Sequence, residues 1–253
     1  MKVVILAGGL GSRLSEETYS KPKPLIEIGN RPIIWHIMKH YYSFGLKDFI
    51  ICCGYKGYQI KKYFTEYYLN NSDIKINLED NSIKIISSNS EKWNITLVDT
   101  GEKTMTGGRL KRVGNLLPDD NFCLTYGDGL SDIKIDKLIE FHNNHGKLAT
   151  LSSSNIPNRF GILDIQNDKV LAFKEKPSDY INIGYFVLSK KVLDLINGDQ
   201  TIWEQDPINN LAKDRELMTF KHDGFFQPMD TLREKIELEK MWNNNRAPWK
   251  LWS

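Results

Sequence analysis

A glycine-rich loop beside an arginine is the first group of residues whose types could do chemistry. The apolar run Val3–Ala7 is followed by Gly8, Gly9, Gly11 and Arg13. The run predicts a buried parallel strand, and the backbone N–H groups of such a loop, together with an arginine, can bind anions. We therefore predict a phosphate-binding loop, with an ordinary strand-to-helix turn as the alternative. The spacing matches neither the P-loop motif nor the dinucleotide-binding G-x-G-x-x-G motif.

Lysines and a carboxylate could complete such a site. Lys21 and Lys23 lie in the segment KPKPL, which its two prolines hold extended. Either lysine could reach bound phosphates, or both could lie in a solvated turn. Asp128 lies between two glycines, directly after the apolar run 121–126, and open α/β sheets bind ligands at such strand ends. Because Mg²⁺ is held by one or two carboxylates plus substrate phosphates, we favour Asp128 as a metal ligand over a turn-forming aspartate.

Two further segments could contribute to binding. Residues 104–110 form a second glycine-rich turn that leads into a predicted helix, with Arg109 in its first turn. A helix N-terminus favours an anion or a polar base edge. Asp230 precedes a charged helix predicted over 232–242. It is either the N-cap of that helix or a second metal carboxylate, and the local sequence alone favours the cap.

The elements that must position these residues alternate between strands and helices. Buried strands are predicted over 48–53 and 121–126, and further strands over 149–152, 182–188 and 217–222. Helices are predicted from Pro32 to Gly45 and over 58–69, 135–145 and 232–242, and Trp203–Pro207 opens another. Residues 161–165 and 169–174 predict a hairpin. Residues 73–99 alternate in polarity, which predicts short antiparallel strands or an arm for subunit contact. The order indicates an α/β fold.

Length and charge narrow the class of protein. The 253 residues suffice for one large domain, which we expect over 1–253. The net charge of +2 gives no indication of a nucleic-acid or membrane surface. The first apolar run is too short for a signal peptide or a membrane span. Cys52, Cys53 and Cys123 lie in apolar runs, so we expect reduced, buried thiols and a cytoplasmic protein. The five histidines show no nucleophile or metal-ligand pattern.

The motifs together resemble one family. LAGGLGSRL, SKPKPL, MTGGRLKR, TYGDG, FKEKP and QPMDTLR occur in this order across the chain. The sequence resembles the sugar nucleotidyltransferase (nucleotidyl-diphosphosugar pyrophosphorylase) family, and within it the bacterial cytidylyltransferases that use glucose 1-phosphate. The resemblance implies a Rossmann-like, GT-A-like fold with a mixed, mostly parallel sheet, flanking helices and small antiparallel arms. It also implies transfer of CMP from CTP to a phosphorylated acceptor, with release of pyrophosphate, by a homo-oligomer.

The resemblance assigns roles to individual residues. Arg13, Lys23 and Lys176 would neutralise phosphates during catalysis. Asp128 and Asp230 would bind Mg²⁺, which changes Asp230 from an expected cap to an expected ligand. The nucleotide would be held by Leu6, Ala7, Gly8, Gly9, Gly11, Ser12, Arg13, Lys23, Thr104, Arg109, Asp128 and Gly129. The acceptor would be held by Glu175, Lys176, Asn182 and Tyr185.

Departures from the family pattern fall on the acceptor side. The loop after Pro177 is short, residues 178–181, and Ile183 stands where the family has a glycine. We expect α-D-glucose 1-phosphate as the acceptor, giving CDP-glucose. The alternative is a non-sugar phosphate such as L-glutamine phosphate, giving CDP-L-glutamine for capsule phosphoramidate synthesis. A nucleotide-binding regulator without catalysis is an alternative of a different class, and the candidate metal carboxylates and lysines argue against it.

Overall fold

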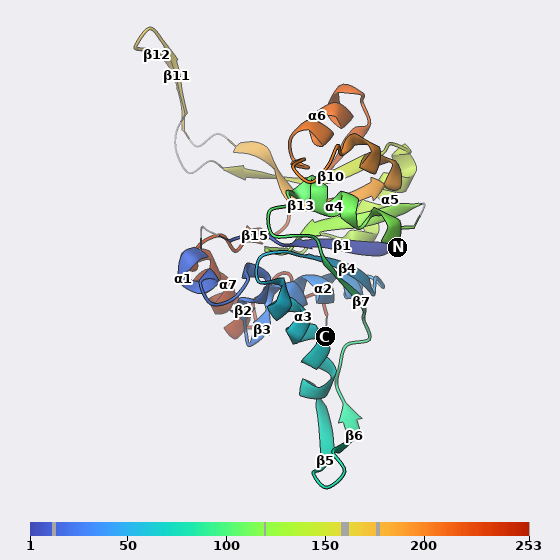
Figure 1. Cartoon of the computed structure of the whole chain (residues 1–253). Coiled ribbons are helices and arrows are strands. Elements are labelled where there is room, and N and C mark those ends of the chain that lie inside the picture. The colour runs from blue at the N-terminus through green and yellow to red at the C-terminus, as the bar shows by residue number, and fades with distance from the viewer. Residues whose placement is uncertain (12–13, 119, 158–161, 176–177, 253) are drawn as a thin grey trace.

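A seven-stranded sheet forms the centre of the computed structural model, which describes residues 1–11, 14–118, 120–157, 162–175 and 178–252 (Figure 1). The strand order is β14-β10-β13-β8-β1-β4-β7. β13 runs antiparallel to β8 and β10, and the other described pairings of this sheet are parallel, which confirms the predicted fold class. The strands are β1 (Lys2–Ala7), β4 (Asp48–Cys53), β7 (Asn94–Asp99), β8 (Asn121–Tyr126), β10 (Ala149–Pro157), β13 (Ser178–Ser189) and β14 (Leu217–Lys221).

The apolar runs form strands because both faces of the sheet are covered. In β1, Val3 and Ile5 pack into one hydrophobic cluster, whereas Val4 and Leu6 pack into another on the opposite face. Alternate residues of a strand point to opposite faces, so a strand covered on both sides needs a continuous apolar run. This is why the central strands were recognisable from sequence.

Helices cover both faces of the sheet. α2 (Ile33–Ser43), α3 (Gly57–Asn70) and α7 (Leu232–Asn243) lie on one side, and α4 (Thr106–Arg112) and α6 (Asp206–Lys213) lie on the other (Figure 1). The remaining helical segments are α1 (Ser15–Thr18), α5 (Ile135–His145) and the 3₁₀ turns η2 (Lys23–Leu25), η3 (Gly114–Leu116) and η4 (Lys190–Leu195). The predicted helices are confirmed, although Pro32 is the N-cap of α2 rather than its first helical residue. No helix in the described part of the chain is long and apolar enough to cross a membrane.

Two hairpins project from the body (Figure 1). One is formed by β5 (Ser72–Asn77) and β6 (Ser82–Ser88), and the other by β11 (Ile162–Gln166) and β12 (Lys169–Lys174). Both were predicted, but the prediction for the end of residues 73–99 was wrong. There, β7 pairs in parallel with β4 at the sheet edge. Its alternating pattern arises because Ile95 and Leu97 pack on one core cluster while Thr96 between them is exposed at the sheet edge, although Val98 packs on the opposite cluster.

Two small antiparallel pairs complete the described strands. β2 (Glu27–Ile28) pairs with β3 (Arg31–Pro32), and β9 (Gly129–Ser131) pairs with β15 (Phe226–Pro228). The second pair is important for the site, because it brings the chain just before α7 back to the end of β8. The expectation that residues 1–253 form a single domain stays a prediction.

Candidate active site

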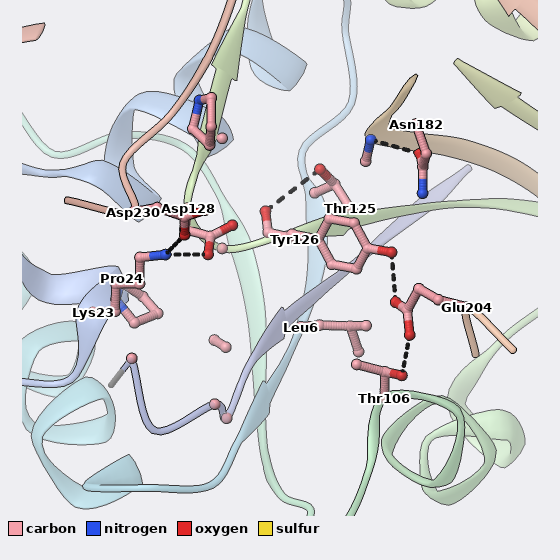
Figure 2. Close-up of a pocket in the computed structure, with 18 of the residues that line it drawn as sticks. Leu6, Lys23, Pro24, Thr106, Thr125, Tyr126, Asp128, Asn182, Glu204 and Asp230 are labelled. Carbon is pink, nitrogen blue, oxygen red and sulfur yellow. Dashed lines mark hydrogen bonds and ion pairs between the residues drawn. The ribbon is translucent and has the colours of Figure 1, made fainter. Parts of the chain in front are cut away.

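A pocket of about 660 Å³ opens where β1 and β8 end (Figure 2). The two strands are parallel neighbours, with Leu6 opposite Tyr126, so their carboxyl ends meet at one edge of the sheet. Most of the predicted site residues that the structure describes line this pocket. They are Leu6, Ala7, Gly8, Gly9, Gly11, Lys23, Thr104, Arg109, Asp128, Gly129, Asn182, Tyr185 and Asp230.

The other four predicted site residues cannot be placed in the pocket from the described part of the chain. Ser12, Arg13 and Lys176 lie outside the residues that the structure describes. Glu175 is exposed, directly follows the last residue of β12, and is not among the residues that line the pocket. The roles assigned to these four residues stay predictions.

The first loop needs its glycines for two physical reasons. Gly11 has φ +65°, a conformation that residues with a side chain rarely adopt. A Cβ on Gly8 would lie 2.1 Å from Nη1 of Arg109, so a side chain there would displace the guanidinium. The loop thus approaches the α4 arginine closely while its backbone lines the pocket.

Lys23 is the cation at the centre of the site. It lies in the 3₁₀ turn η2, where Pro22 and Pro24 hold the backbone, and it is 7% exposed. Its ammonium donates to Oδ2 of Asp128 and to Oδ1 of Asp230, each at 2.6 Å (Figure 2). Of the two lysines in this segment, Lys23 is therefore inside the pocket. Lys21 is exposed and pairs with Glu27 on the surface.

The second carboxylate reaches the site through the β9–β15 pairing. Pro228 pairs with Gly129, and the N–H of Met229 donates to the carbonyl of Asp128 at 2.9 Å. The N-cap of α7 is Thr231, which forms a reciprocal capping box with Glu234. The interpretation of Asp230 as the N-cap is therefore wrong, since the next residue caps the helix.

The two carboxylates fit a magnesium site. They already enclose one positive charge, the Lys23 ammonium, and they offer only oxygen donors, which Mg²⁺ prefers. Within the described residues, no group of three or more His, Cys, Asp or Glu side chains could hold a metal ion. Two carboxylates supplemented by substrate phosphates are the usual composition of a nucleotide-dependent magnesium site.

Arg109 is buried beneath the first loop. Its guanidinium donates mainly to backbone carbonyls and to one hydroxyl, those of Gly8, Cys53, Gly101, Glu102 and Thr100. Burial lowers the pKa of this side chain, and within the described residues no carboxylate forms an ion pair with it. Arg109 thus fixes the loop and places a positive charge beside the pocket. Its direct contact with CTP stays a prediction.

The acceptor segment lies on β13. Asn182, Ile183 and Tyr185 line the pocket, but the hydroxyl of Tyr185 is buried and donates to the carbonyl of Gly129 at 3.1 Å. Tyr185 therefore joins β13 to β9. Burial raises the pKa of its hydroxyl, so the group remains a neutral donor. A direct contact between Tyr185 and the acceptor stays a prediction.

Among the pocket residues that the sequence did not predict, three are joined by hydrogen bonds: Thr106, Tyr126 and Glu204. Each lines the pocket, and Glu204 accepts hydrogen bonds from the other two (Figure 2). Tyr126 directly precedes the Gly-Asp-Gly turn and Thr106 lies within the second glycine turn, so both motifs offered a signal. Glu204 comes from a loop about eighty residues further along the chain, and nothing in its local sequence marks it.

The described thiols and most described imidazoles are unsuited to acid–base or nucleophilic work. Cys52 and Cys123 are free and buried, and burial raises the pKa of each thiol to about 12. Burial lowers the pKa of His36, His40 and His142 to about 4. The prediction of reduced, buried cysteines is confirmed for the described chain.

Comparison with known proteins places the chain in a family. The model of the nucleotidyl transferase family matches residues 2–215, so the chain belongs to this family, as its motifs predict. It is 56% identical to the glucose-1-phosphate cytidylyltransferase of Salmonella typhi, with 100% of each chain covered. It is 41% identical to the probable glucose-1-phosphate cytidylyltransferase of Bacillus subtilis strain 168, again over 100% of each chain.

Solved structures share the fold. HddC from Yersinia pseudotuberculosis has a TM-score of 0.70 at 24% identity, covering 95% of this chain and 99% of that chain. A UDP-glucose pyrophosphorylase complexed with UDP-glucose also has a TM-score of 0.70, at 15% identity, covering 97% and 99%. At these identities the likeness concerns the fold alone.

Proposed function

We propose that the protein transfers CMP from CTP to α-D-glucose 1-phosphate, releasing pyrophosphate and forming CDP-glucose. The observation that carries the proposal is the convergence of Lys23, Asp128 and Asp230 at one end of the pocket, in a chain that belongs to the nucleotidyl transferase family. Relatives that match over the full length are named for this sugar phosphate. They favour it over L-glutamine phosphate, and they favour an enzyme over a regulator without catalysis.

The chemistry requires positioning and charge neutralisation. An oxygen of the acceptor phosphate attacks the α-phosphorus of CTP in line, and pyrophosphate leaves. The attacking oxygen is already an anion, so no general base is needed. Buried neutral histidines such as His36 and His40 are consistent with that. Two anions must be brought together, and Lys23 inside the pocket lowers their repulsion and orients them.

Asp128 and Asp230 are the residues that would hold Mg²⁺. Two carboxylates alone would repel the phosphates, and a bound Mg²⁺ would offset that repulsion with its positive charge. Lys23, which lies between these two carboxylates, is the residue that would meet the phosphates when the carboxylates hold the ion. Arg13 and Lys176 are proposed to neutralise further phosphate charge.

Replacing one carboxylate tests the function. Asp128→Asn keeps the size of the side chain but removes its charge, so we expect pyrophosphate release with CTP, Mg²⁺ and glucose 1-phosphate to fall at least about a hundredfold, roughly 2.7 kcal/mol. The control is Asp194→Asn, a surface aspartate outside the pocket, which should retain wild-type turnover. Near-normal turnover by Asp128→Asn would reject the metal assignment. A much larger kcat/KM with L-glutamine phosphate than with glucose 1-phosphate would reject the acceptor.

We also propose that the protein is a homo-oligomer with contacts through its projecting hairpins. The β5–β6 hairpin exposes Ile76, Leu78 and Ile83, of which Leu78 is 83% exposed. The β11–β12 hairpin exposes Leu163 and Phe173. Clustered apolar side chains on a projecting arm are typical of interaction surfaces.

A further inference from the structure

A carboxylate that forms no ion pair with any described lysine, arginine or histidine lies at one end of the pocket. Glu204 is on the loop before α6, and its Oε2 accepts a hydrogen bond from Oγ1 of Thr106 at 2.6 Å. Its Oε1 accepts from the hydroxyl of Tyr126 (Figure 2). All three residues line the pocket, and Glu204 retains partial exposure there. The side chain is thus part of the surface that a bound substrate meets.

The orientation of this carboxylate is fixed from both sides. Oγ1 of Thr106 also accepts a hydrogen bond from the N–H of Trp203 at 2.9 Å, which joins α4 to the loop. The ring of Tyr126 packs directly on Gly184 of β13, where a Cβ would lie 2.4 Å from the ring. A carboxylate held in this way loses little side-chain freedom on binding a ligand, which favours recognition.

The charge of Glu204 determines which part of a substrate it can meet. Within the described residues no lysine, arginine or histidine forms an ion pair with it, whereas Lys23 lies with Asp128 and Asp230 at the other end of the pocket in Figure 2. A carboxylate repels phosphates, so this end suits an uncharged group. Each carboxylate oxygen has two acceptor sites, and each already accepts one hydroxyl. One further donor per oxygen can be accommodated.

The neighbours of Tyr126 indicate the acceptor rather than the nucleotide. The Asn182 amide interacts with the Tyr126 hydroxyl and lowers the pKa of that hydroxyl. Burial of Tyr126 raises the same pKa by a larger amount. The Oδ1 of Asn182 accepts from the N–H of Gly184 at 2.9 Å, which orients the amide. Both residues belong to β13, the predicted acceptor segment.

We propose that Glu204 accepts hydrogen bonds from ring hydroxyls of the sugar 1-phosphate and thereby selects a polyhydroxylated acceptor. The inference rests on the proposed function and adds a specificity-determining residue to it. The Glu204 carboxylate and the Asn182 amide, which both neighbour the Tyr126 hydroxyl, offer fixed acceptors and donors that match the hydroxyls of a sugar ring. A site built to bind a substrate hydroxyl discriminates strongly against an analogue that lacks it.

The test is Glu204→Gln, which keeps the shape and replaces one acceptor oxygen by a donor. We expect the KM for glucose 1-phosphate to rise about 10- to 100-fold, because a hydrogen bond to a charged group is lost. The KM for CTP and the binding of CTP measured by calorimetry should not change. Among the 2-, 3-, 4- and 6-deoxy analogues of glucose 1-phosphate, at least one should be used equally by the wild type and the variant. The matched control is Glu216→Gln, whose carboxylate pairs with Lys147 away from the pocket.

Three results obtained with an active wild type would overturn the inference. A raised KM for CTP together with use of UTP would assign Glu204 to the base. A lower melting temperature with equal losses for both substrates would assign it a structural role. Wild-type kinetics in an active enzyme would show that it meets no substrate. If the wild type itself releases no pyrophosphate with glucose 1-phosphate, the proposed function fails and the inference fails with it, so the two failures are distinguishable.

Discussion

Removing the Lys23 ammonium should destabilise the protein in a way that a divalent ion repairs. In Lys23→Met, Asp128 and Asp230 lose the cation that holds each of them at 2.6 Å. Breaking a fully buried ion pair by removing one partner costs roughly 3–5 kcal/mol. The side chains of Asp128 and Asp230 are 33% and 19% exposed, and solvent screening reduces the cost, so we expect about 2 kcal/mol. For a chain of this size that loss lowers Tm by about 4–8 °C.

The assay is thermal unfolding with and without Mg²⁺ and no nucleotide. Mg²⁺ should raise the Tm of Lys23→Met more than that of the wild type, since the ion no longer competes with an ammonium for the carboxylates. Lys21→Met is the matched control, because this lysine of the same segment pairs with Glu27 on the surface. The reasoning is refuted if Lys23→Met is as stable as the wild type without Mg²⁺, or if Mg²⁺ stabilises both proteins equally.

Three further expectations follow from which side chains are buried and which are exposed. The thiols of Cys52 and Cys123, with pKa raised to about 12, should resist iodoacetamide at pH 8 in the folded protein and react once it is denatured, as mass spectrometry would show. His36 and His40 have folded pKa values of about 4, below the ordinary 6.5. Their contribution to stability is complete above pH 6.5 and is lost as the pH falls toward 4, by up to about 1.4 kcal/mol per pH unit for each histidine, and urea titrations at pH 7 and pH 5 would measure it. Leu78→Asp should shift light-scattering mass toward the monomer without changing helix content.

The sequence predicted the sheet well because its central strands have a strong physical signature. β1 and β8 are covered on both faces, and only a continuous apolar run satisfies that environment. An edge strand carries a weaker signal. β7 packs Ile95 and Leu97 on one core cluster but is largely exposed on its other face, so its sequence pattern resembles that of a hairpin strand. The parallel pairing with β4 is what distinguishes an edge strand of the central sheet from a hairpin strand. The sequence of one segment does not reveal with which strand it pairs.

The site was predictable where a motif contains the residue, and not where the fold alone supplies it. Lys23 and Asp128 lie in short motifs with stiff or glycine-rich backbones. Asp230 was ambiguous because two adjacent residues, Asp230 and Thr231, can each cap a helix, and only the capping box with Glu234 decides between them. Glu204 had no local signal, since its significance comes from two hydroxyls on different elements.

The distribution of charge in the pocket explains why Glu204 is informative. Lys23 lies at one end, where phosphates must meet, and the carboxylate of Glu204 lies with Thr106 and Tyr126 at the other. A substrate that is anionic at one end and rich in hydroxyl donors at the other matches this polarity, and a sugar 1-phosphate has that form. Glu204→Lys replaces the negative charge at this end of the pocket by a positive one, and should therefore strongly reduce turnover of the 1-phosphates of uncharged sugars, such as glucose 1-phosphate. The same variant should favour acceptors that carry a second anionic group. Comparing glucose 1-phosphate with glucuronic acid 1-phosphate in the pyrophosphate-release assay would reveal this change in acceptor preference.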